Sequence, residues 1–448
     1  METVSLPLEL NLRGKVDNKE LSMALDIVSP PNEMRFVARF CDVSSDRIRS
    51  IVNMHWGLIG EYVHLIASAC YPFPDALRAL SEPMCVFPIE GLPGNRYFPG
   101  TTPMDMIENR AEEILLQLFG VVDSHRATIQ PHSGTQANQV VFNAVLAPDD
   151  RVFSLKASQG GHISHSVLVG RRNPVLHYPL KSDATIDYDA LEAIAIMERP
   201  KLIIAGGSSY PREIDFARIG RIAHANGALF HADVSHTATF IAAGVHAPIA
   251  EHADFITFNT VKNMRGPNGG VLIYRKQFQP NISKGLFPDT QGGPNENTMF
   301  AKLVGLECLL QIDLKRYASN MVTLARAISE TFSSRGITVV TGGTDSHLVL
   351  LDLRGTGLTG VEAERLCEQH RVLVSRNLIP NDHEKAHIAS GLRIGTSCCA
   401  ILGYTVEDAS RLANWIADRI MGVEPEMPHA LIQELASRYN RQLLPEPL

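Results

Sequence analysis

Several reactive side chains of this sequence stand at or just after apolar segments that would form buried strands. They are Lys262 after ADFITF (253–258), Asp233 and His236 at and after the end of ALFHADV (228–234), and Ser208 after KLIIAGG (201–207). A lone lysine at a strand end is most often a solvated surface residue, and a strand-end aspartate is most often a cap or turn residue. An amine, a carboxylate and an imidazole together can instead hold and activate a reactive carbonyl cofactor.

A pattern suited to phosphate binding occurs upstream, in ATIQPHSGTQANQ (127–139). Ser133, Gly134 and Thr135 lie where a strand would turn into a helix, and small residues there leave backbone N–H groups free for a phosphate. Pyridoxal phosphate needs such a helix start, a lysine for its aldehyde, an aspartate for its ring nitrogen and an imidazole against its ring. Each piece alone is a weak signal, but the ordered set indicates this cofactor.

Apolar segments alternate with helix-like segments from about residue 65 to residue 310. The clearest strand candidates are RVFSL (151–155), KLIIAGG (201–207), ALFHADV (228–234), DFITF (254–258) and GVLIYR (270–275). The segment FARIGRIAHANG (216–227) is typical of a helix that ends at a glycine. Buried strands alternating with helices predict a mainly parallel α/β sheet, which binds ligands at the carboxyl ends of its strands.

The length of 448 residues allows two to three domains. We expect an N-terminal arm over residues 1–60, a large cofactor-binding domain over 61–314 and a smaller α+β domain over 315–448. The last part combines the helix candidates 316–336 and 360–370, and a closing helix, with the strand candidates 337–343, 347–353 and 372–375.

The composition, with 45% hydrophobic residues and a formal net charge of −7, is that of an ordinary soluble protein. No basic stripe predicts nucleic-acid binding, and no apolar stretch reaches the roughly 20 residues that a membrane-spanning helix needs. The N-terminus carries charges where a signal peptide would have its apolar core, so we expect a cytoplasmic protein. The seven cysteines form no CxxC pair and no cluster with histidine, so we expect reduced thiols and no metal site.

The sequence resembles the serine hydroxymethyltransferases, a family of pyridoxal-phosphate enzymes in the aspartate-aminotransferase-like class, fold type I. The resemblance runs from about HLIASACYP (64–72) to GLRIGTS (391–397). It rests on EGLPGNRYFPG (90–100), QPHSGTQAN (130–138), GGHISH (160–165), DVSH (233–236), TVKNMRGPNGG (260–270), FPDTQGGP (287–294), NLIPND (377–382) and SGLRIGT (390–396). It implies a large domain around a mainly parallel, seven-stranded type of sheet and a smaller C-terminal α+β domain.

The resemblance also implies how the cofactor is held. Lys262 matches the Schiff-base lysine, Asp233 the partner of the pyridine nitrogen, and His162 the imidazole stacked on the ring. His236 and Ser208 match residues near the phenolic oxygen of the ring. The phosphate would be held by Ser133, Gly134 and Thr135, with Gly292 and Gly293 contributed by a neighbouring subunit.

For the substrate, the resemblance assigns Arg393 to the α-carboxylate, with Ser68 as a helper, and Glu90 to acid–base work on the substrate hydroxyl and one-carbon transfer. Because the family builds each site from two subunits, with the segment from Glu90 to Phe98 reaching across, it implies an obligate homodimer or a tetramer built from two dimers.

Some positions depart from the usual family pattern. Pro88 and Phe98 replace two tyrosines, Val261 replaces a histidine before the lysine, Ala69 and Cys70 replace a carboxylate and an amide, and Gln159 replaces a histidine. Loss of hydrogen-bonding groups in one pocket costs about a kcal/mol or more each, which suggests a change of substrate.

Two enzymatic readings therefore stand side by side. The first is a serine hydroxymethyltransferase-like enzyme that makes or breaks a carbon–carbon bond at the α-carbon of an amino acid, with tetrahydrofolate as a candidate co-substrate. The second is a folate-independent aldolase or transaldolase, or a specialised biosynthetic enzyme for an unusual amino acid or aldehyde. A non-catalytic family member is disfavoured because Lys262, Asp233, His162, Glu90 and Arg393 are all retained.

Overall fold

The computed structural model describes residues 45–423 and 430–439, which divide into two compact units. The smaller unit contains α1 (Ser45–Glu61) and α14 (Ala430–Ala436), which contact each other. Most of the arm predicted over residues 1–60 lies outside the described residues. The larger unit begins at His64 and contains all the residues discussed below.

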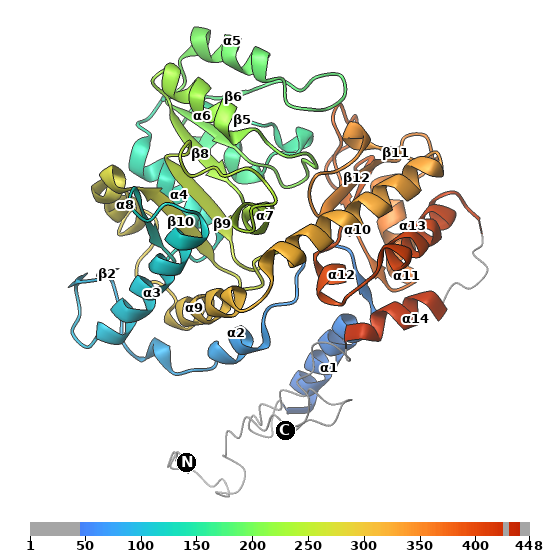
Figure 1. Cartoon of the computed structure of the whole chain (residues 1–448), viewed down its shortest axis with the longest axis horizontal. Helices are drawn as coiled ribbons and strands as arrows, with labels where there is room; N and C mark the ends of the chain where they lie inside the picture. The colour runs from blue at the N-terminus through green and yellow to red at the C-terminus, as the bar shows by residue number, and fades with distance from the viewer. Residues whose placement is uncertain (1–44, 424–429, 440–448) are drawn as a thin grey trace, which may run out of the picture. The chain divides into compact units, whose positions relative to one another are not determined.

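A seven-stranded sheet is the centre of the larger unit (Figure 1). Its strands, in spatial order, are β4 (His125–Thr128), β10 (Gly270–Arg275), β9 (Phe255–Asn259), β8 (Leu229–Asp233), β7 (Leu202–Ala205), β5 (Val152–Ser154) and β6 (Val175–His177). All neighbours pair in parallel except at β10, which is antiparallel to both β4 and β9. The predicted mainly parallel α/β fold, with its strand candidates, is confirmed.

Helices cover both faces of this sheet because its strands are apolar on both sides. In β7, Ile203 packs in one buried cluster, whereas Leu202 and Ile204 pack in another, as expected for side chains that alternate along a strand. The first cluster also contains side chains of α3 (Thr102–Leu118), α5 (Tyr188–Glu198), α6 (Phe216–Ala225) and α9 (Glu296–Leu310). The second contains side chains of α4 (Gly134–Val145) and α8 (Gln279–Leu286).

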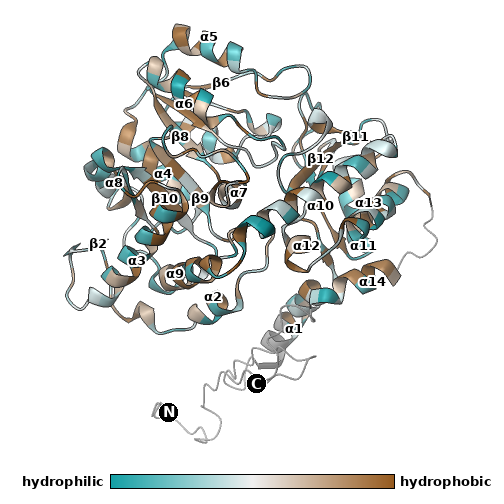
Figure 2. Cartoon of the chain, in the orientation of Figure 1, coloured by the Kyte–Doolittle hydropathy of each residue, from teal (hydrophilic) through white to brown (hydrophobic). Residues whose placement is uncertain are grey.

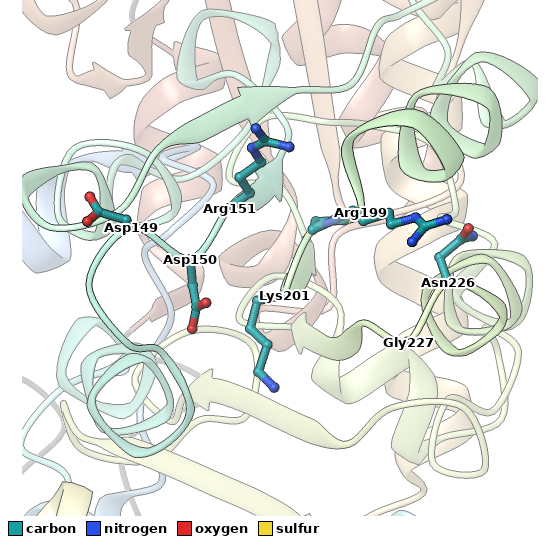
Figure 3. A pocket seen from close by; sticks show the side chains of 8 residues that line it. Asp149, Asp150, Arg151, Arg199, Lys201, Asn226 and Gly227 are labelled. Atoms are coloured by element: carbon teal, nitrogen blue, oxygen red, sulfur yellow. The ribbon is translucent and has the colours of Figure 1, made fainter.

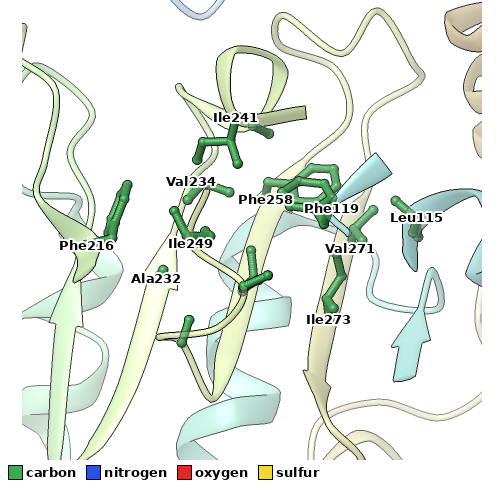
Figure 4. Close-up of a cluster of buried hydrophobic side chains, with 14 of the residues drawn as sticks. Leu115, Phe119, Phe216, Ala232, Val234, Ile241, Ile249, Phe258, Val271 and Ile273 are labelled. Carbon is green, nitrogen blue, oxygen red and sulfur yellow. The ribbon is translucent and has the colours of Figure 1, made fainter. Parts of the chain in front are cut away.

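Aromatic and branched side chains fill the first cluster, part of which is shown in Figure 4. Phe119, just after α3, stacks on Phe258 of β9 with ring centroids 5.6 Å apart. Figure 2 shows hydrophilic and hydrophobic residues interspersed along helices such as α6 and α10 (Leu314–Ser334), the pattern of helices that bury one side.

The C-terminal part forms a four-stranded antiparallel sheet in the order β11 (Thr338–Val339), β12 (Leu348–Asp352), β15 (Gly391–Gly395), β14 (Ser375–Asn377). Its helices are α10 (Leu314–Ser334), α11 (Gly360–Gln369), α12 (Ser397–Ile401) and α13 (Val406–Ile420). The α+β character expected here is confirmed. The domain division at residues 314 and 315 remains a prediction, although α10 begins at that point.

Other short elements of the larger unit include α2 (Pro74–Ala79), α7 (Ala238–Ala242) and a hairpin of β2 (Gly91–Leu92) and β3 (Asn95–Arg96). In Figure 1 the hairpin lies at the edge of the unit beside α3. Within the described residues, no helix is long and apolar enough to cross a membrane.

Candidate active site

Lys262 lies in a loop that is closed by its own side chains. Asn259, at the end of β9, accepts hydrogen bonds at Oδ1 from the backbone N–H of Val261 (3.2 Å) and of Gly269 (3.1 Å). Thr260 Oγ1 donates to the carbonyls of Gly269 (3.1 Å) and Pro267. These bonds fix the backbone on both sides of Lys262 before any ligand binds.

The Lys262 amine makes no hydrogen bond or ion pair with any residue that the structure describes. Burial lowers the pKa of Lys262 to about 8, with the Asp233 carboxylate opposing this effect and the Arg393 cation adding to it. About a tenth of the amine is therefore uncharged and nucleophilic at pH 7, far more than for a solvated lysine. This is the property that a lysine needs to react with an aldehyde.

Asp233 is buried at the end of β8 and both of its oxygens are held. Oδ1 accepts from the N–H (3.0 Å) and hydroxyl (2.6 Å) of Ser235, while Oδ2 accepts from Asn138 Nδ2 (2.8 Å) and bonds to His165 Nε2 (2.9 Å). Burial alone would raise the pKa of Asp233, but the hydrogen bond and charge of His165, with His162 and Lys262 nearby, hold it well below its usual range. The carboxylate is ionised and fixed in place.

His165 and Asn138 are site residues that the sequence analysis did not single out. The signal was available, because His165 follows His162 by three residues in GGHISH and Asn138 stands in QPHSGTQAN. The ligand atoms of His162, His165 and Asp233 lie within 4.8 Å of one another, close enough to share a metal ion. However, His165 Nε2 is already engaged with Asp233.

His162 is held as a neutral ring beside this group. Its Nδ1 is 2.6 Å from the hydroxyl of Ser164 and accepts from the Ser164 N–H (3.2 Å), and Ser164 in turn accepts from Asn138. Burial lowers the pKa of His162 to about 4, so the ring carries no charge near neutral pH. A neutral imidazole can stack on an aromatic ligand.

The turn at Ser133 that was predicted to bind phosphate does lead into a helix, and its binding of phosphate remains a prediction. Ser133 caps α4, with its hydroxyl accepting from the N–H of Gln136 (3.1 Å), and Gly134 and Thr135 begin the helix. A β-carbon at Gly270 would lie 2.3 Å from the Ser133 carbonyl oxygen, so only glycine allows the Lys262 loop to approach this turn. The turn and the lysine loop are therefore in direct contact.

Ser208 and His236 lie near the same group. Ser208 donates from its hydroxyl to the carbonyl of Gly161 (3.1 Å), which ties it to the His162 loop. The ring of His236 stacks on that of His347 with centroids 5.4 Å apart. Burial, and then the charges of Lys262, His347 and Arg393, hold the pKa of His236 well below its usual range, so it is neutral.

Arg393, on β15, is a cation without a carboxylate partner in the described parts of the chain. Its Nη1 donates to the carbonyl of Ser208 (2.6 Å), and its buried Nε has no hydrogen-bond partner. Burial lowers the pKa of Arg393 to about 10, which leaves it charged at neutral pH. The segment of Ser68 runs beside β15, where a β-carbon at Gly395 would lie 2.3 Å from Ala67 Cα.

Glu90, Gly292 and Gly293 form a second group. A β-carbon at Gly292 would lie 3.9 Å from Glu90 Oε1, and one at Gly293 would lie 3.7 Å from Glu90 Cγ. No hydrogen bond, ion pair or ring contact joins Glu90 to Lys262 or Asp233 in the described residues. Phe98 is 39% exposed beyond the hairpin and likewise has no contact of these kinds with Lys262 or Asp233.

A separate pocket of about 430 Å³ opens at the other end of the sheet (Figure 3). It is lined by residues that precede β5, β7 and β8, among them Asp150, Arg151, Arg199 and Lys201. Because these strands are parallel, their amino ends lie at the edge opposite Asp233. The pocket contains none of the residues predicted for the site.

Comparisons with known proteins agree with this geometry. Residues 43–416 match the family model described as serine hydroxymethyltransferase. A serine hydroxymethyltransferase of Bordetella avium is 39% identical over 390 residues, covering 84% of this chain and 92% of that protein. One of Ralstonia pickettii is 38% identical over 385 residues (85% and 92%), and serine hydroxymethyltransferase 1 of Cupriavidus pinatubonensis is 40% identical over 361 residues (80% and 86%).

Proposed function

The chain belongs to the serine hydroxymethyltransferase family, and from this premise we propose which of its residues perform the chemistry of the family. The family comprises pyridoxal-phosphate enzymes of fold type I that interconvert serine and glycine, with tetrahydrofolate as co-substrate. The first of the two enzymatic readings is thereby supported, and the folate-independent alternative is not favoured.

The observation that carries the residue assignment concerns the Lys262 amine, which makes no hydrogen bond or ion pair with the described residues. The ionised, fixed carboxylate of Asp233 lies near enough to raise its pKa against the effect of burial. The neutral His162 ring and the glycine-lined contact between the lysine loop and the Ser133 turn complete a cradle that fits pyridoxal phosphate. When bound, this cofactor supplies an aldehyde for amines and a ring that accepts electrons from the substrate. Lys262 would hold it, Asp233 would keep a proton on the ring nitrogen, and Ser133–Thr135 would take the phosphate.

Arg393 is proposed to bind the substrate carboxylate. Its guanidinium is charged, donates to the Ser208 carbonyl and has an N–H with no partner among the described residues. An incoming carboxylate would accept from this donor. Ser68 would contribute from the neighbouring segment. Fixing the carboxylate orients the bonds at the α-carbon of the amino acid, which lowers the entropic part of the barrier.

Glu90 is proposed to move the proton of the substrate hydroxyl in the site of a second subunit. Glu90 packs against Gly292 and Gly293, which we propose reach the same neighbouring site. Exposed apolar residues before and after the hairpin, Phe87 (60% exposed) and Tyr97 (68%), support an interface there. We therefore propose an obligate homodimer, with association of two dimers into a tetramer as a further step. We also propose that the protein acts in the cytoplasm.

Serine turnover tests the proposed reaction. The cofactor-loaded protein is incubated with L-serine, with and without tetrahydrofolate, and glycine is quantified. We expect rapid glycine formation that depends on folate. Equal rates without folate would instead support the aldolase reading. Borohydride reduction and peptide mapping should place the cofactor on Lys262, and an adduct elsewhere would overturn that assignment.

Mixing two inactive variants tests the shared site. Glu90→Gln homodimers should keep only a small, measurable residual rate, and Lys262→Ala homodimers should be inactive. Subunit exchange creates hybrids in which one site carries both changes and the other carries neither. By random mixing of equal amounts, about 25% of wild-type activity should return. No recovery after demonstrated exchange would mean that Glu90 and Lys262 act in the same subunit.

A further inference from the structure

The backbone on both sides of Glu90 is held by one buried guanidinium. The side chain of Arg96 is only 4% exposed, and its Nη1 donates to the carbonyls of Ile89 (3.0 Å) and Gly91 (2.6 Å). The Glu90 side chain itself makes no hydrogen bond or ion pair with the described residues. Its position in a single subunit is therefore set through its backbone.

Helix α3 holds the guanidinium in turn. Asp105 accepts from Arg96 Nε (2.8 Å) and from the N–H of Gly94 (2.9 Å), and Glu108 accepts from Arg96 Nη2. Glu108 is 5% exposed, so this ion pair is largely removed from water. Burial raises the pKa of Glu108, and the nearby Arg96 charge opposes that effect. The hairpin is thus tied to a 17-residue helix at its turn and at its base.

Gln130 connects the same group to the glycines beside Glu90. Its Nε2 donates to Gly91 O (3.0 Å) and to both oxygens of Glu108 (3.1 and 2.9 Å). The backbone carbonyl of Gln130 accepts from Gln291 Nε2 (3.2 Å), and Gln291 directly precedes Gly292 and Gly293. One network therefore places Glu90 and the two glycines that pack against it.

We propose that Arg96 is a positioning residue for Glu90, which it aims by clamping the carbonyls of Ile89 and Gly91. This inference rests on the acid–base role proposed above for Glu90. An ion pair with a purely structural role could contact any part of the hairpin. This guanidinium instead donates to the carbonyls of the two residues that flank the acting carboxylate, while that carboxylate has no bond of its own in the described chain. Arg96 touches neither substrate nor cofactor in this scheme and acts through Glu90.

The experiment is a double-mutant cycle on the cofactor-loaded enzyme. Arg96→Lys keeps the charge beside Asp105 and Glu108 but loses the fork that spans two carbonyls. We expect its kcat to fall at least tenfold, with KM for serine and cofactor affinity changed by less than twofold. In the double mutant with Glu90→Gln, Arg96→Lys should lower kcat by less than a further twofold, because the carboxylate that Arg96 positions is already absent.

Arg126→Lys is the matched control. Arg126 also pairs with a carboxylate of α3, Glu112, but it is distant in sequence from the hairpin and 36% exposed. The Arg126→Lys variant should keep kcat within twofold of the wild-type value. Hydrogen exchange should be faster in the peptide covering residues 88–98 of Arg96→Lys and unchanged in the control. If Arg96→Lys does not fold, Asp105→Asn weakens the clamp from the helix side and is used in its place.

The outcomes separate the positioning role of Arg96 from the acid–base role of Glu90. Additive losses in the double mutant, a parallel loss of cofactor affinity, or unchanged hydrogen exchange over residues 88–98 would overturn the positioning role and leave the proposed function standing. A fully active Glu90→Gln enzyme would overturn the proposed role of Glu90 and this inference with it.

Discussion

Replacing Arg393 with methionine should separate substrate recognition from folding. Among the described residues, the Arg393 guanidinium has one hydrogen bond, to the Ser208 carbonyl, and its Nε has none. Among the described residues no carboxylate pairs with it, and burial lowers its pKa to about 10 without discharging it at neutral pH. A desolvated cation without a counter-ion costs stability. Arg393→Met should therefore leave the melting temperature unchanged or raise it slightly.

The loss of function should be large. A hydrogen bond to a charged group contributes about 1.5–3 kcal/mol, so a two-pronged contact with a carboxylate contributes roughly 3–5 kcal/mol. At about 1.36 kcal/mol per tenfold change, kcat/KM for serine should fall on the order of 10²- to 10⁴-fold. Arg393→Lys keeps the charge but not the planar fork, so its loss should be smaller than that of Arg393→Met.

Binding of glycine and methylamine isolates the carboxylate, because the two amines differ only in that group. Each is titrated into the holoenzyme while the cofactor absorbance is followed. Wild type should prefer glycine strongly, and in Arg393→Met the ratio of the two affinities should approach one. An unchanged ratio, or an equal loss for both amines, would refute carboxylate recognition by Arg393. A fall in the melting temperature would show that Arg393 stabilises the fold instead.

Three further predictions follow from the same geometry. Because burial lowers the pKa of Lys262 to about 8, the rate of cofactor attachment to the apo-protein, followed by absorbance, should rise with pH and reach half of its maximum near pH 8. The Asp233 carboxylate raises this pKa, so Asp233→Asn should move the half-maximal pH downward. Because His165 lowers the pKa of Asp233, His165→Phe should raise that pKa, so the acid limb of the pH–activity profile should move to higher pH; an unmoved limb would contradict this. Gly206→Ala would place a β-carbon 2.1 Å from the Asp233 carbonyl, at φ +146°, and should lower stability by about 2 kcal/mol or more in chemical denaturation, whereas Gly227→Ala meets no neighbour and serves as the control for positive φ.

The parts of the fold that the sequence predicts well are those specified by local patterns. The segment GVLIYR was expected as a strand over 270–275, and β10 has these bounds. Ser133 was expected at a strand-to-helix turn, and it caps α4. In both cases the deciding information, apolar continuity or a capping hydroxyl, lies within a few residues of the element.

The contacts that hold the site are harder to predict because they join distant segments. Lys302 is an example: it lies in an apolar helix, and its buried ammonium donates to the carbonyls of Ile129 (2.6 Å), Pro131 (2.9 Å) and Gly270 (2.9 Å). It thereby joins the phosphate turn to the strand after the Lys262 loop. A lysine within an apolar helix can be seen in the sequence, but its partners, more than 30 residues away at the nearest, cannot be predicted from the pattern.

The departures from the family pattern acquire a physical interpretation from the same contacts. Val261 takes the place of a histidine, yet the loop is held at that point by its backbone N–H on Asn259 and needs no side chain there. Cys70 takes the place of an amide, and its sulfur lies 3.7 Å from the hydroxyl of Tyr317, which donates to the carbonyl of Asn263 next to Lys262. The support of the Lys262 loop at Val261 is therefore independent of the side chain that changed, whereas the support through Tyr317 is in contact with the substituted Cys70. It follows that the change at Val261 should leave cofactor binding intact, whereas a change at Cys70 can reach the Lys262 loop through Tyr317.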